Sequence, residues 1–357
     1  MATDKTTRRG VTMATKRKFT AAHRRIRNQH LALSSLALAV ACALPGHAVA
    51  AVYIVSTQAE LFAAINAANA GSDPGSTIQL SGDLALTTST MLPTPNKPLT
   101  IDTQGFTLSG MGAANGVTFS AGGGTLTVYG SLYGGDGTDV AGSASNGGGG
   151  LGVNRGSSNL VNNGTITGGN GGHASSGNYG GLGVAQGAGT FINNGTVTGG
   201  VGDGGLPSGI GATLISGGTI TNHGTIQGGA SRTGTGGIGL EFNLGGGTLN
   251  NDGTIKGGES LGGTATGGYG VYASATGASV IHNTGTIEGG SGAAAIHGVS
   301  SLNIVNSGTI SAGVGQANAI QLGSATRTIT LQLQAGSTIN GRRCRSSGAM
   351  PASSHCR

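Results

Sequence analysis

Short apolar stretches bounded by glycines recur along most of the chain. From residue 150 onward they share one phrase, Asn-x-Gly-Thr followed by Ile or Val, which occurs six times. Its Asn and Gly positions are Asn162 and Gly164, Asn193 and Gly195, Asn222 and Gly224, Asn251 and Gly253, Asn283 and Gly285, and Asn306 and Gly308. The glycines of successive copies lie 31, 29, 29, 32 and 23 residues apart. Self-similarity at such a period predicts stacked units rather than one globular core.

Within each unit the polar and apolar residues alternate as they do in β-strands. In the Gly-Thr-Ile segment the Ile can point inward while the Thr faces solvent. The units carry turn and strand signals but no helix pattern, so we predict an all-β fold, a right-handed parallel β-helix. We interpret the repeated Asn as a turn residue that bonds to local backbone. If the units stack in register, the Asn side chains can also bond from rung to rung.

One helix is predicted, before the first repeats. Val52–Val55 reads as a strand, and Thr57 with Glu60 forms a capping box that begins a helix with one apolar face. The open end of a solenoid exposes apolar core and strand edges that natural proteins cover. We therefore assign residues 51–75 as an N-terminal cap and residues 76–340 as the β-helix.

Glycine makes up 71 of the 290 residues in 51–340. Such a fraction without a Gly-X-Y period also occurs in disordered chains. Ile, Leu and Val recur at matched places in the units, and disordered chains lack that apolar content. We interpret the glycines as turn formers between short strands, at positions that need a positive φ.

The first 50 residues are typical of a secretory signal peptide with an extended basic region. An apolar run follows the basic residues, and small residues precede a predicted cleavage site after Ala50. Two alternatives remain for this segment: a lipoprotein signal that leaves a lipid on Cys42, and a twin-arginine signal at Arg24 and Arg25. Translation from Met13 rather than Met1 would shorten the basic region.

The net charge of +6 comes from the two ends of the chain. Residues 1–50 carry a net charge of +8 and residues 341–357 carry +4, which leaves −6 for residues 51–340. A nucleic-acid partner requires a basic stripe, so we expect none. The body also lacks cysteine, so the sequence predicts neither disulfides nor a cysteine metal site there.

Several short motifs resemble catalytic or ligand-binding signatures. Gly-x-Ser-x-Gly around Ser260 matches a nucleophile elbow, but no helix follows it, as that motif requires. Residues 200–205 match a dinucleotide fingerprint without its βαβ frame. Residues 134–139 resemble half of a calcium-binding nonapeptide, of which there is one copy, with Ala141 where the motif needs a large apolar residue. At this glycine content such matches are expected by chance.

The histidines and acids of the body are also candidates for chemistry. The histidines occupy unmatched positions without ligand spacing: His173, His223, His282 and His297. The acids fall at different offsets in their units: Asp203, Glu241, Asp252, Glu259 and Glu288. Glycan-active β-helix enzymes need clustered carboxylates or a base paired with Arg or Lys, and here Asp252 and Glu259 have a spacing that could bring them together on one rung. We expect no catalytic residue, no cofactor and no metal ion.

The capping-box helix, the segment Thr100–Gly110 and the Asn-x-Gly-Thr units together resemble autotransporter passenger domains, which Gram-negative bacteria secrete by the type V route. The resemblance covers about residues 52–340. It implies a non-enzymatic surface protein with a role in adhesion or biofilm contact, whose partner is a glycan or protein on a host or bacterial surface. Alternatives are a glycan-active β-helix enzyme and a two-partner-secreted exoprotein, although the Asn-Pro-Asn motifs of the latter family are absent.

The resemblance also implies a C-terminal outer-membrane barrel, and the sequence as written contains none. After Asn340 the composition changes abruptly to Arg, Ser and Cys, so we interpret residues 341–357 as an aberrant, possibly frameshifted tail. The expected location is periplasmic for the chain as written, and the cell surface or the medium where a barrel is supplied.

Overall fold

A computed structural model of the chain describes residues 50–87, 92–110, 117–118, 123–137, 153–156, 158–172, 179–203, 205–262, 265–274, 276–323 and 328–341. Contacts divide the chain into two units, residues 1–49 and 50–357, and every described residue belongs to the second. The predicted leader with Cys42 and the tail after Gly341 lie outside the described residues, as do His173 and Ala141.

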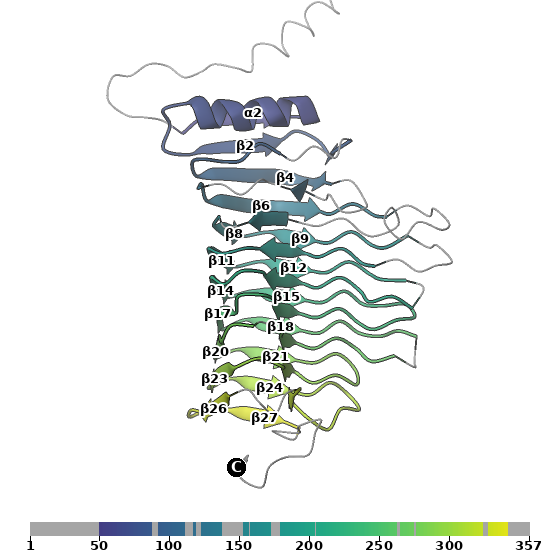
Figure 1. Ribbon diagram of the computed structural model, residues 1–357. Helices are drawn as coiled ribbons and strands as arrows, with labels where there is room; N and C mark the ends of the chain where they lie inside the picture. The colour runs from purple at the N-terminus through teal and green to yellow at the C-terminus, as the bar shows by residue number, and fades with distance from the viewer. Residues whose placement is uncertain are drawn as a thin grey trace, which may run out of the picture. The chain divides into compact units, whose positions relative to one another are not determined.

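The repeats form a parallel β-solenoid in which the strands of successive rungs stack in three columns (Figure 1). Column 1 consists of β8 (Leu160–Asn162), β11 (Thr190–Asn193), β14 (Thr219–Asn222), β17 (Gly247–Asn251), β20 (Ser279–Asn283), β23 (Leu302–Asn306) and β26 (Ile329–Leu333). Column 2 consists of β9 (Thr165–Thr167), β12 (Thr196–Thr198), β15 (Thr225–Gln227), β18 (Thr254–Lys256), β21 (Thr286–Glu288), β24 (Thr309–Ser311) and β27 (Thr338–Asn340). Column 3 consists of β5 (Val117–Thr118), β7 (Val153–Gly156), β10 (Val184–Gln186), β13 (Ala212–Leu214), β16 (Leu240–Phe242), β19 (Val271–Ala273), β22 (Ile296–Gly298) and β25 (Ile320–Leu322). The predicted all-β solenoid is confirmed.

Further strands near the N-terminal end of the stack pair in parallel with one another. They are β1 (Val52–Val55), β2 (Ser76–Leu80), β3 (Leu84–Ala85), β4 (Leu99–Ser109) and β6 (Leu126–Tyr133). The sequence predicts two strands, Leu99–Asp102 and Phe106–Leu108, separated at Gly105, whereas β4 is continuous. The reason is a local irregularity: Gln104 and Gly105 both have a positive φ, and the register with β6 shifts between Asp102 and Thr107. The chain therefore bends at this point without ending the strand.

The single described helix, α2 (Gln58–Ala70), lies across the N-terminal end of the stack (Figure 1). Both halves of the capping box are present, because Thr57 Oγ1 accepts the Glu60 N–H at 3.2 Å and the Glu60 carboxylate accepts the Thr57 N–H at 3.1 Å. Leu61 and Ile65 are fully buried on the face that covers the first rungs. No helix among the described residues is long and apolar enough to span a membrane.

The strands stack in register, so equivalent residues of successive units form continuous rows. Ile226 of column 2, for example, pairs with Val197 on one side and Ile255 on the other, and all three are fully buried. The Thr that precedes each of them lies at the surface or half-buried. Burying such a side chain contributes about 1.5–3 kcal/mol, and in a solenoid these contributions sum over neighbouring rungs.

Most glycines of the repeats serve close packing rather than turns. Only thirteen described glycines have a positive φ, and the glycine of the Asn-x-Gly-Thr phrase is never among them. An ideal Cβ on Gly195 would lie 2.0 Å from the carbonyl oxygen of Gly164 in the preceding rung, and one on Gly224 would lie 2.0 Å from that of Gly195. The interpretation of the glycines as positive-φ turn formers is therefore wrong for this phrase. A side chain is excluded there because one rung sits directly on the next.

Candidate functional site

The repeated Asn residues lie at the corner between columns 1 and 2, and their side chains are buried. Each side-chain nitrogen lies 2.7–2.8 Å from the side-chain oxygen of the next Asn along the stack, from Asn162 through to Asn306. Asn162 also accepts the backbone N–H of Gly164 at 3.1 Å, as an Asx turn does. Because no ligand reaches buried side chains, this Asn ladder holds the fold and does not form a binding site.

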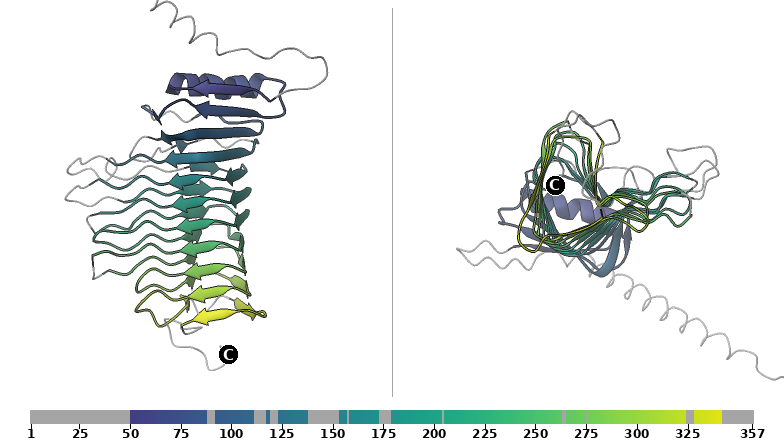
Figure 2. Two further views of the ribbon diagram at one scale, coloured as in Figure 1. Left: turned by 180° about the vertical axis from the view of Figure 1, so that it is seen from behind. Right: turned by 90° about the horizontal axis from the view of Figure 1, so that it is seen from below.

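Long loops project from one side of the stack, one above another, and together form an arm (Figure 2). We define the arm as the described residues of 168–183, 199–211, 228–239 and 257–270, which connect column 2 to column 3. In the next unit, 23 residues long by its repeat spacing, the chain turns back at once, with the Ala293 N–H bonded to the Gly290 carbonyl at 2.9 Å. The arm therefore ends there.

Backbone hydrogen bonds between glycines hold the arm together. Each bond joins a segment that leaves column 2 to a segment that returns to column 3. The N–H groups of Gly229, Gly237, Gly258 and Gly268 donate to the carbonyl oxygens of Gly209, Gly229, Gly237 and Gly258, respectively, at 2.7–2.8 Å. We call this row the glycine seam. An ideal Cβ on Gly237 would lie 1.9 Å from the Gly209 carbonyl oxygen. The seam thus excludes side chains, and this packing makes the arm a double layer.

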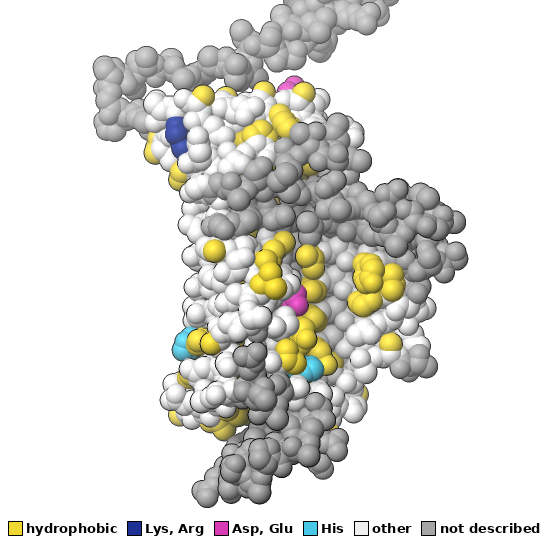
Figure 3. Space-filling view, viewed as in Figure 1, with side chains coloured by type: hydrophobic (Ala, Val, Ile, Leu, Met, Phe, Trp, Pro, Cys, Tyr) yellow, Lys and Arg dark blue, Asp and Glu magenta, His cyan; other side chains and the backbone are white. Residues whose placement is uncertain are grey.

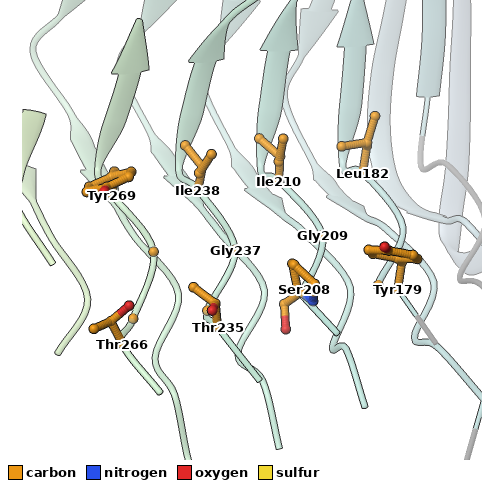
Figure 4. A pocket seen from close by; sticks show the side chains of 15 residues that line it. Tyr179, Leu182, Ser208, Gly209, Ile210, Thr235, Gly237, Ile238, Thr266 and Tyr269 are labelled. Atoms are coloured by element: carbon orange, nitrogen blue, oxygen red, sulfur yellow. The ribbon is translucent and has the colours of Figure 1, made fainter. Parts of the chain in front are cut away.

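A lateral groove of about 400 Å³ runs along the base of the arm (Figure 4). One wall is a ladder of residues that lie two positions before each column 3 strand: Leu182, Ile210, Ile238 and Tyr269. The other wall carries Tyr179, Ser208, Thr235 and Thr266, and seam glycines lie between the walls. No charged residue is among the described residues that line the groove.

The groove ends at a cluster of aromatic rings. Tyr269 stacks on Tyr272 with ring centroids 5.8 Å apart, and its ring meets that of His297 edge-on at 4.5 Å. Burial raises the pKa of Tyr269 and lowers the pKa of His297. Both ring nitrogens of His297 are buried without a hydrogen-bond partner among the described residues. Burial therefore favours the neutral form of the His297 ring, which packs edge-on against Tyr269.

One carboxylate lies beside the aromatic cluster. Glu241 occupies the same outer row of column 3 as Tyr272, directly opposite it on the neighbouring rung. The Ser274 hydroxyl donates to its carboxylate at 3.3 Å. Burial raises the pKa of Glu241, and the hydrogen bond from Ser274 opposes that rise. Glu241 follows the groove residue Ile238 by three positions, but it is not among the described residues that line the groove.

The other four acids have basic partners away from the groove. The Asp252 carboxylate lies 2.7 Å from the His223 ring nitrogen Nδ1. Asp203 pairs with Arg232 at 3.5 Å, and Lys256 pairs with both Glu259 at 3.2 Å and Glu288 at 3.8 Å. The spacing of Asp252 and Glu259 could have brought them together on one rung, but the two carboxylates have different partners. His223 and His282 are exposed. None of these five acids is among the described residues that line the groove, so the described groove holds no pair of carboxylates.

Residues of two other motifs singled out from the sequence, Ser260 and Asp136, make local hydrogen bonds. Ser260 lies in the arm, where its hydroxyl donates to the Gly234 carbonyl at 2.9 Å, and the next element that the structure describes after it is the strand β19. In the loop after β6, the Asp136 carboxylate accepts the hydroxyl of Tyr133 and the backbone N–H of Asn170, the latter at 2.7 Å. Burial and the Asp136 hydrogen bond raise the pKa of Tyr133 to about 12. Within the described ranges no three His, Cys, Asp or Glu side chains gather to hold a metal ion.

Sequence reasoning missed the groove. The signal was present as a Gly-apolar-Gly-apolar pattern, for example Gly209-Ile210-Gly211-Ala212. Simple alternation places both apolar side chains on one face. In the structure Ala212 is fully buried, whereas Ile210 is partly exposed and lines the groove. On the face in Figure 3, apolar side chains gather in the middle of the stack and on the arm, and few coloured side chains are charged.

No protein-family model, curated protein or solved structure shows a significant match to the chain.

Proposed function

We propose that the chain is an exported, autotransporter-like passenger that attaches to surfaces through its lateral face and performs no catalysis. The observation that carries this proposal is the uncharged groove along the arm, which is built from equivalent residues of successive rungs. A repeated, passive surface suits attachment to an extended partner. The resemblance of residues 52–340 to passenger domains supports the same conclusion.

Attachment is tested with particles coated with the full chain. The particles are incubated with Gram-negative cells and with cultured animal cells, and retention under flow is counted against particles coated with the heat-denatured chain. We expect retention on at least one surface with the native chain alone. Equal retention of native and denatured chains on every surface would contradict the proposal.

Export is tested separately. Expression of the full chain in a Gram-negative host should yield a product outside the cytoplasm that begins at Ala51, because the sequence predicts cleavage after Ala50. N-terminal sequencing of the fractionated product checks this. An uncleaved chain in the cytoplasm would contradict export. A product that begins at a lipid-modified Cys42 would show that the leader is a lipoprotein signal and that cleavage does not occur after Ala50.

A glycan-active enzyme is the second candidate function. The observation that favours it is the position of Glu241, a half-buried carboxyl with a raised pKa beside aromatic rings, which is the environment of a general acid. Hydrolysis by a pair of carboxylates requires a second one nearby, and the described groove lacks it. Products from incubation with glycans that disappear in Glu241→Gln would favour the enzyme over the attachment module.

A further inference from the structure

The lateral groove has the chemistry of a site for an uncharged, amphipathic chain. Its lining combines a continuous apolar ladder with exposed hydroxyl side chains, Thr235 and Thr266, on the opposite wall. Since no charged residue lines it, the groove offers nothing to balance a phosphate, sulfate or carboxylate partner. Polyanionic ligands, including nucleic acids and sulfated glycans, are therefore poor matches.

Aromatic rings lie at both ends of the groove. Tyr179 is 51% exposed and lies at one end, and Tyr269 lies at the other, on the opposite wall (Figure 4). Tyr269 is held in place by the rings of Tyr272 and His297. Because neighbouring rings already fix the partly exposed Tyr269 ring, it can bind a flat apolar surface with little further loss of side-chain entropy.

The groove repeats with the rungs. Its apolar wall has one residue per rung over four rungs, and strands in register are spaced by about 4.8 Å. This spacing is close to the length of one sugar unit in an extended glycan. Pyranose rings offer apolar C–H faces to aromatic and aliphatic side chains and hydroxyl edges to Thr and backbone groups.

A peptide strand fits the groove less well. An added strand needs free backbone groups along the wall. The wall carbonyls are already bonded to the next layer of the stack: Ile210, Ile238 and Tyr269 accept the N–H groups of Gly183, Gly211 and Gly239, each at 2.9 Å. The wall thus offers side chains and few backbone acceptors.

We propose that the lateral groove binds a neutral, extended glycan with about one sugar per rung, and that Tyr179 and Tyr269 stack against its sugar rings. This inference rests on the proposed attachment function and names its partner. The described lining offers one apolar residue in each of four rungs, which corresponds to about four sugar units, and the arm ends after the rung of Tyr269.

The test is titration calorimetry of the full chain with neutral oligosaccharides of two to six hexose or N-acetylhexosamine units. We expect affinity to rise with length up to about four units and then to level off. Tyr179→Ala and Tyr269→Ala should each weaken binding about tenfold. The matched control is Tyr129→Ala, because Tyr129 is similarly exposed at 47% but lies outside the groove. Tyr179→Ala keeps the test valid if Tyr269→Ala disturbs the aromatic cluster.

Three outcomes would overturn the glycan assignment: no neutral oligosaccharide binds, a sulfated oligosaccharide or an apolar peptide binds instead, or binding is unchanged in both groove variants. Repeating the particle assay with these variants separates the two proposals. Attachment that persists in Tyr179→Ala and Tyr269→Ala removes the groove as its cause and leaves the proposed function standing. Loss of attachment in Tyr129→Ala as well would place the contact elsewhere on the lateral face and overturn the groove assignment.

Discussion

Asn193 and Asn194 are neighbours in the sequence but have opposite environments. The Asn193 side chain is fully buried in the Asn ladder, bonded to Asn162 and Asn222 at 2.8 Å each. The Asn194 side chain is exposed and bonds to that of Asn163 at 2.7 Å. A buried polar group that loses its partner costs about 1–3 kcal/mol, whereas an exposed one is satisfied by water.

We therefore predict that Asn193→Ala lowers the free energy of unfolding by about 3 kcal/mol, because it removes the bonds that Asn193 donates to the Gly195 and Thr225 carbonyls and takes away the Asn193 donor of the buried Asn222 oxygen. Asn194→Ala is the matched control and should change it by less than about 0.5 kcal/mol. Urea denaturation of both variants checks this. Equal effects of the two substitutions would show that the ladder does not stabilise the stack.

His297 provides a residue-scale prediction on pH. Burial lowers its pKa from the ordinary value of 6.5, so the folded state favours the neutral ring. At pH above 6.5 the ring is neutral in both states and adds no penalty. As the pH falls below 6.5, the unfolded chain takes up the proton first and stability decreases until the folded pKa is reached.

The variant His297→Phe keeps an aromatic ring but cannot be protonated. Its loss of stability between pH 7.5 and 5.5 should be smaller than that of the original chain, measured by the urea midpoint at each pH. The substitution should be tolerated because neither ring nitrogen has a hydrogen-bond partner among the described residues. The same pH dependence in both proteins would contradict the neutral, buried state of His297.

At the scale of elements, the arm depends on glycines for close backbone contact. The glycine seam joins outgoing and returning segments by hydrogen bonds of 2.7–2.8 Å, and the groove wall is the returning layer. A side chain in the seam must push two rungs apart, which costs about 1–3 kcal/mol in a well-packed interior. The groove therefore exists because the seam keeps the two layers of the arm together.

Gly237→Ala should destabilise the protein by about 3 kcal/mol, since the new Cβ would meet the Gly209 carbonyl. Gly82→Ala is the control, because no heavy atom lies within 4 Å of the ideal Cβ and Gly82 has no positive φ. Hydrogen exchange of residues 228–239 should show faster opening in Gly237→Ala alone. Unchanged exchange there would mean that the seam does not hold the arm.

The elements that the sequence predicted are those with a side-chain pattern. The alternation around Ile226 predicted a buried strand, the repeated Asn predicted a ladder in register, and the Thr57 capping box predicted the helix. The arm could not be predicted in this way, because backbone hydrogen bonds between glycines hold it together, and these do not appear as an alternation of apolar and polar side chains. The aromatic cluster was also hidden, since Tyr272 and His297 meet only after loop lengths have set the register.

At the scale of the whole stack, repetition turns weak local features into an extended surface. One rung supplies a single apolar residue to the groove, and four rungs supply a site of about 400 Å³. The same in-register stacking buries the core and the Asn ladder. Stability and the proposed attachment surface thus depend on one property, the register between rungs.

The most direct test of the central claim, non-catalytic attachment through the groove, uses a surface coated with a neutral glycan that binds in the titration. Particles carrying the full chain are passed over the surface, and the mass of the glycan is measured before and after contact. We predict that the particles are retained, that free oligosaccharide releases them, and that the glycan mass is unchanged. A shortened glycan would contradict the claim in favour of an enzyme, and retention that free oligosaccharide cannot reverse would contradict the groove as the point of attachment.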